Sequence, residues 1–111
     1  MRNGQEQDQF LGEQGRILQE LATALVAATP EWWDEATLRL QAHEDGYLHS
    51  IASTQHPRDI VTPTDDIYEQ TFALQDLFAA NSKQFTTAVF TVYRDDQNGE
   101  ESWGFRVEYT Y

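Results

Sequence analysis

The chain has 111 residues, of which 19 are acidic, seven are basic and none is cysteine, so its formal net charge at pH 7 is −12. This length suits a single domain with one hydrophobic core. The charge argues against a protein that binds nucleic acid through its phosphates, and the cysteine count excludes disulfides, zinc-thiolate sites and a cysteine nucleophile within these residues.

Residues 1–9 are polar and carry acids where a signal peptide would need an apolar stretch, so we expect a flexible lead-in and a cytoplasmic protein. No apolar run approaches the length of a membrane span. From Phe10 onward, apolar residues recur at helical spacing until Pro30 ends the pattern. We predict a helix from about Gly15 to Ala28, within one domain that covers residues 10–111.

Two adjacent tryptophans, Trp32 and Trp33, follow the predicted helix, and we expect one to be buried and the other partly exposed. Beyond them, residues 36–43 alternate between apolar and polar side chains, and a second strand is predicted over residues 47–53. The acidic segment Glu44-Asp45-Gly46 lies between the two strands. These features predict an antiparallel hairpin.

Two loop lengths are compatible with this hairpin. A two-residue loop would put Leu48 and Ala52 on the polar face, whereas a three-residue loop with Gly46 in the left-handed region puts them beside the apolar face. Apolar matching favours the three-residue loop. The outer face would then carry an amphipathic patch, which consists of Tyr47, His49 and Ile51.

The segment Thr62-Pro63-Thr64-Asp65 predicts the start of a second helix, with Thr62 as the N-cap and Pro63 in the first position. Apolar residues of this helix fall on one stripe, and its outer side carries Asp65, Glu69 and Asp76. Whether a short fifth strand forms near Ile60 is an open question at this point.

The last quarter of the chain, Thr86 to Tyr111, predicts a second hairpin closed by Asn98-Gly99, a pair typical of type I′ turns. Its register pairs Ala88 with Tyr109, Phe90 with Val107, Val92 with Phe105 and Arg94 with Trp103. The predicted fold class is α+β in the order α-β-β-α-β-β: an antiparallel sheet of four to five strands in two hairpins, with two helices packed on one face.

The sequence shows no phosphate-binding glycine loop and no nucleophile elbow. In the three-residue register, His43 and His49 are diagonal neighbours on one face and suggest a metal site together with Asp45, but histidines at a rim are more often ordinary surface residues. We therefore expect no catalytic, cofactor-binding or metal-binding residues. The acids Asp95, Asp96, Glu100 and Glu101 gather at the predicted tip of the last hairpin. There they are either simply solvated or placed to meet a basic partner.

Several motifs occur in a characteristic order: Pro30-Glu31-Trp32 after the first helix, an acidic turn with a glycine, Asp66-Ile67-Tyr68-Glu69 in the second helix, and aromatic alternation from Phe105 to Tyr111. This ordered set resembles the YezG-like antitoxin or immunity proteins of bacterial polymorphic-toxin and contact-dependent growth inhibition systems. The resemblance covers most of the chain after the lead-in.

The resemblance implies a protein without enzymatic activity or cofactors that binds and neutralises a cognate toxin domain. The toxins of such systems are mostly nucleases, so the partner is a protein with a basic substrate groove, and neither direct nucleic-acid binding nor membrane binding is expected. The expected contact residues are acidic or amphipathic: Asp95, Asp96, Glu100, Glu101, Tyr47, His49, Ile51, Asp65, Glu69 and Asp76. The alternative is an acidic adaptor or regulatory protein-binding module that is not linked to a toxin. The oligomeric state and the toxin's choice between RNA and DNA are left open.

Overall fold

The computed structural model describes residues 2–44, 46–96, 99 and 102–111, with the backbone alone for residues 2–8. The elements follow the predicted order α-β-β-α-β-β. They are α1 (Arg2–Ala28), β1 (Glu35–His43), β2 (Gly46–Ala52), α2 (Asp65–Ala80), β3 (Thr87–Arg94) and β4 (Trp103–Thr110).

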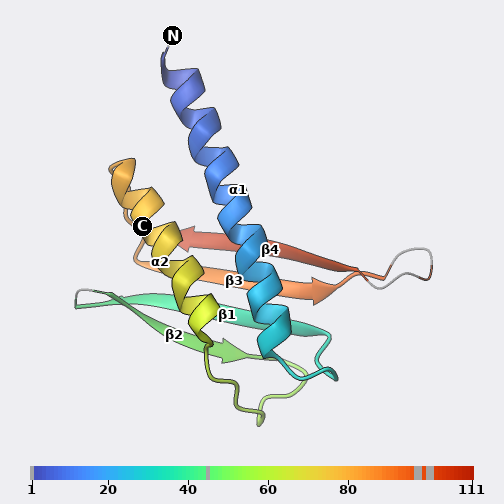
Figure 1. The fold of residues 1–111 in the computed structure, drawn as a ribbon. Helices are drawn as coiled ribbons and strands as arrows, with labels where there is room; N and C mark the ends of the chain where they lie inside the picture. Colours follow the sequence, from blue (N-terminus) through green and yellow to red (C-terminus); the bar gives the residue numbers. More distant parts are fainter. Residues whose placement is uncertain (1, 45, 97–98, 100–101) are drawn as a thin grey trace.

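The four strands form one antiparallel sheet in the order β2-β1-β3-β4, so β2 and β4 are its edges. Both helices lie on the same face of the sheet, as Figure 1 shows. The predicted α+β fold is therefore confirmed. The fifth strand that was left open near Ile60 does not form in the described part of the chain, where Ile60 is 92% exposed.

The core lies between the helices and the sheet. Leu25 of α1, Ile67 of α2 and Leu38 of β1 are each fully buried there. The rings of Phe10 and Phe78 meet edge to face at 5.2 Å and join the two helices. Neither helix in the described ranges combines the length and the apolar character needed to cross a membrane.

Helix α1 begins at Arg2, so the predicted start near Gly15 was wrong. Gly12 and Gly15, which have a low helix propensity, do not interrupt the helix, because buried Phe10 anchors this half of α1 against α2. The ammonium group of Lys83 also lies 4.4 Å from the centre of the Phe10 ring. The flexibility expected for residues 1–9 stays a prediction.

The predicted register of the last hairpin is confirmed. Val92 lies opposite Phe105 and Phe90 lies opposite Val107. The ladder continues past the strand ends, because the Asp95 N–H donates to the Ser102 carbonyl oxygen at 2.8 Å. Gly99 has a φ of +78°, as a turn of this kind needs, while Asn98 lies outside the described residues.

The predicted register of the first hairpin was wrong by one residue. Leu38 lies opposite Ile51, and His43 lies opposite Gly46, so the loop has two residues rather than three. Glu44, and not Gly46, has the positive φ, at +52°. This register buries Ile51 to 8% exposure and leaves Leu48 on the outer face at 56% exposure. Burial of the Ile51 side chain favours the two-residue loop. The sequence argument considered only where Leu48 and Ala52 would lie, and so it missed this burial.

The N-cap of α2 is Thr64 rather than the predicted Thr62. Its side-chain oxygen accepts a hydrogen bond from the Ile67 N–H at 3.4 Å. The later start places Asp65 and Asp66 in the first helical turn, where the helix dipole favours acids. Pro63 thus precedes the cap instead of opening the helix.

Candidate functional site

The outer side of α2 forms the candidate site. Asp65, Glu69 and Asp76 are all exposed on it, as predicted. Two aromatic side chains share this side of the helix, Tyr68 at 37% exposure and Phe72 at 57%. The buried residues of α2 lie on the opposite side, against the core. We call this surface the acidic-aromatic face of α2, and it consists of Asp65, Tyr68, Glu69, Phe72 and Asp76.

No positive charge on α2 offsets these acids, because the helix contains four acidic residues and no lysine or arginine. Two exposed basic side chains, Arg39 and Arg106, are on the sheet face that points away from the helices, while Arg16 lies on α1 and Lys83 follows the end of α2. The outer side of α2 itself is therefore negative. Such a surface attracts a positively charged partner over a distance comparable with the Debye length.

A small polar network supports the aromatic part of this face. The His49 and Tyr68 rings are in contact, with centroids 4.7 Å apart. In the neutral ring, the His49 Nδ1–H donates to the Tyr47 carbonyl oxygen at 3.1 Å, and Nε2 lies 2.8 Å from the Thr71 hydroxyl oxygen. The Thr71 hydroxyl has one hydrogen, which it donates either to Nε2 or to the Tyr68 carbonyl oxygen at 2.9 Å. Burial lowers the pKa of His49 and so favours this neutral form. The network holds β2 against α2 directly beneath Tyr68.

The patch predicted from Tyr47, His49 and Ile51 does not lie on the outer face. All three side chains point toward the helices, because the register is shifted by one residue. The Tyr47 hydroxyl donates to the Phe85 carbonyl oxygen, and the two rings stack at 4.7 Å. These residues position α2, and their interpretation as an exposed contact patch was wrong.

The same register separates the two histidines that were considered for a metal site. His43 lies on the outer face near Glu44, whereas His49 faces α2. The prediction that both share one face was wrong. Within the part of the chain that the structure describes, no group of three histidine, aspartate or glutamate side chains could hold a metal ion.

The acidic tip of the last hairpin is described only in part. Asp95 and Asp96 are exposed, and an Asp96 carboxylate oxygen lies 3.5 Å from Arg94 Nε. Glu100 and Glu101 lie outside the described residues, so the clustering of the four acids stays a prediction. The end of β3, which directly precedes Asp95 and Asp96, lies apart from α2 (Figure 1).

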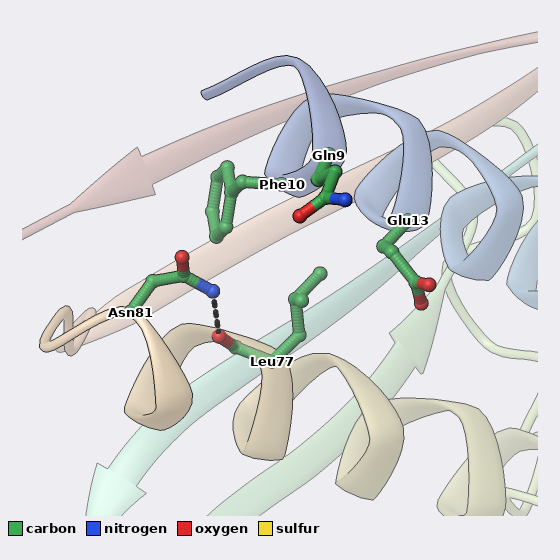
Figure 2. Close-up of a pocket in the computed structure, with 5 residues that line it drawn as sticks. All are labelled: Gln9, Phe10, Glu13, Leu77 and Asn81. Atoms are coloured by element: carbon green, nitrogen blue, oxygen red, sulfur yellow. Dashed lines mark hydrogen bonds between the residues drawn. The ribbon is translucent and has the colours of Figure 1, made fainter. Parts of the chain in front are cut away.

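A pocket of about 570 Å³ lies between the N-terminal half of α1 and the C-terminal end of α2. Figure 2 shows that it is lined by Gln9, Phe10, Glu13, Leu77 and Asn81, with the Asn81 amide donating to the Leu77 carbonyl oxygen at 2.8 Å. Glu13 is the one titratable group among these lining residues. These five lining residues therefore offer no acid-base pair for catalysis.

Sequence reasoning missed the aromatic half of the acidic-aromatic face. Helical spacing could have predicted it, because Tyr68 and Phe72 fall on the same side of α2 as the three acids Asp65, Glu69 and Asp76. Aromatic side chains exposed among charges are typical anchors of protein interfaces. No protein-family model matches the chain, and no curated protein matches it either.

Proposed function

We propose that the chain is an immunity protein that acts in the cytoplasm. It binds a cognate bacterial toxin domain with nuclease activity and covers the toxin's active site or basic substrate groove. The observation that carries this proposal is the acidic-aromatic face of α2, with three exposed acids, two exposed aromatic rings and no basic residue on the helix. The ordered motifs that resemble YezG-like immunity proteins support the same function.

The physical argument is charge complementarity around apolar anchors. A nuclease groove carries basic side chains that bind the phosphates of its substrate. An acidic protein surface can pair with the same basic side chains. Phe72 and Tyr68 would supply the apolar contact area that holds the complex, while Asp65, Glu69 and Asp76 would speed association and set the orientation. Inhibition of this kind needs no catalytic group.

The direct test is co-expression with the toxin domain encoded beside this gene, with a tag on this chain alone. We expect the two proteins to elute as one complex, and we expect cells that make both to survive while cells that make the toxin alone die. If no such toxin is encoded there, or if nothing binds, the immunity proposal is overturned. The adaptor alternative would then become the leading one.

The binding surface has its own test in paired variants. Glu69→Gln with Asp76→Asn removes two charges from the face, and Glu20→Gln with Glu31→Gln removes two exposed charges elsewhere. We expect the first pair, and separately Phe72→Ala, to weaken toxin binding by about tenfold or more. The control pair should bind like the wild type.

A third variant neutralises the hairpin tip at Asp95, Asp96, Glu100 and Glu101. Toxin binding that is sensitive to this variant but not to the α2 variants would move the site to the hairpin and leave the immunity role intact. Equal affinity in all variants would exclude both surfaces.

A further inference from the structure

Strand β4 is an edge of the sheet and presents hydrogen-bonding groups that no described strand pairs with. Because the Asp95 N–H donates to the Ser102 carbonyl oxygen, alternation directs the main-chain groups of even-numbered β4 residues toward β3. The N–H and C=O groups of the odd-numbered residues from Trp103 to Tyr109 therefore point outward. An exposed edge of this kind is a template for another strand.

An apolar groove of about 410 Å³ runs beside this edge, between α1 and β4. Its apolar lining includes Ala22, Val26, Trp103 and Phe105, and Phe105 is 37% exposed. In Figure 1 the N-terminal half of α1 extends past the β4 edge. Leu11 in this half is 55% exposed, and it lies about three turns before Ala22 on the same side of the helix.

We propose that two copies of the chain pair antiparallel through β4, about a two-fold axis at Val107, and so join two four-stranded sheets into one. The order of charges on β4 favours a second copy of this chain as the partner strand, and it also sets the register of the pairing. With Val107 opposite itself, Arg106 of each copy faces Glu108 of the other. A shift of two residues in one direction would place Arg106 against Arg106, and a shift in the other direction would place Glu108 against Glu108.

The hydrogen-bonding groups and the apolar side chains fit the same register. Val107 opposite Val107, and Phe105 opposite Tyr109 of the second copy, are pairs of residues whose main-chain groups all point outward. Arg106 and Glu108 then fall at the non-hydrogen-bonded pairs, where facing side chains come closest. The strand is thus complementary to itself, as a two-fold interface requires.

The two-fold axis also accounts for the groove. It turns the α1 helices antiparallel to each other and brings the overhanging half of each α1 over the other copy's β4. The apolar groove of one copy then faces the Leu11 side of the other copy's helix. The acidic-aromatic face of α2 stays open, because it is the side of the helix opposite the buried residues that contact the sheet, from Tyr109 of β4 to β2. The inference therefore does not depend on the proposed toxin binding.

Charge reversal tests the pairing, with sedimentation measured over a range of protein concentrations. We expect the wild type to reach twice the mass of one chain. Arg106→Glu places like charges opposite each other, and so does Glu108→Arg. Each should weaken the dimer by about tenfold or more.

Two further samples restore the complementary charges. An equimolar mixture of the Arg106→Glu and Glu108→Arg chains should form a heterodimer, and the chain with both substitutions should again form a homodimer. Circular dichroism checks the fold of each variant, since Arg106 also lies over the Tyr93 ring. A monomeric wild type at all concentrations, a dimer that is insensitive to Arg106→Glu, or a mixture that stays monomeric would each overturn the proposal.

Discussion

At the scale of single residues, side-chain hydrogen bonds hold the segment between α1 and β1 in place. One carboxylate oxygen of Asp59 accepts hydrogen bonds from both indole N–H groups, at 3.0 Å from Trp32 and 2.9 Å from Trp33. These two donors lower the pKa of Asp59. Trp33 is buried while Trp32 is 63% exposed, as expected from two adjacent tryptophans. The long loop before α2 is thereby tied to the segment before β1.

His49 should make stability depend on pH. Burial lowers its pKa in the folded chain below the ordinary value of 6.5, so near that pH the unfolded chain binds the proton more readily. The free energy of unfolding should therefore fall as the pH drops below about 6.5, until the folded state also takes up the proton. Urea unfolding at a series of pH values measures this dependence.

The variant His49→Gln should lose this part of the pH dependence, while His43→Gln, on the outer face, should keep it. An unchanged pH dependence in His49→Gln would show that the buried histidine does not titrate in this way.

At the scale of elements, the two hairpins differ in how far the sequence determines their register. In the last hairpin, the turn pair Asn98-Gly99 and the apolar alternation of both strands select one register, and the structure has it. In the first hairpin, β2 carries large apolar side chains on both faces, with Leu48 on one and Ile51 on the other. Local matching of two strands does not decide between them.

The deciding contacts of the first hairpin come from distant parts of the chain. The Tyr47 hydroxyl donates to the Phe85 carbonyl oxygen, and His49 Nε2 lies 2.8 Å from the Thr71 hydroxyl oxygen of α2. For the same reason the predicted exposure of the α2 acids is confirmed, since one helix and its period suffice for it. The predicted exposure of the β2 patch is wrong, since the packing of α2 on the sheet decides it.

Alanine substitution in β2 tests the register. Ile51→Ala should lower the free energy of unfolding by about 2–4 kcal/mol, because it removes a buried side chain from the core. Leu48→Ala should change it by less than about 0.5 kcal/mol, because Leu48 is exposed on the outer face. Urea denaturation of both variants measures the difference, and the reverse order would support the three-residue loop instead.

The glycines of α1 offer a second test at this scale. A Cβ atom at Gly12 or Gly15 would meet nothing within 4 Å, and both positions lie inside the helix. Each glycine-to-alanine change should therefore raise the free energy of unfolding by about 0.5–1 kcal/mol. Thermal unfolding measures it, and a destabilised variant would show that this half of α1 is not a helix in solution.

At the scale of the whole molecule, two different surfaces serve two proposed partners. The acidic-aromatic face is the outer side of α2, whose Tyr68 contacts β2, while the free edge of the sheet is β4 at the opposite end of the strand order. A dimer through β4 would leave both α2 faces exposed. Each dimer could then bind two toxin domains without competition between the interfaces.

The most direct measurement of the proposed function is the nuclease activity of the purified toxin domain during titration with this protein. We predict that the wild type abolishes cleavage near one equivalent, and that Glu69→Gln with Asp76→Asn requires a higher concentration than the Glu20→Gln and Glu31→Gln control. The difference should shrink as added salt screens the charges. Full cleavage in the presence of excess wild-type protein would contradict the proposed function.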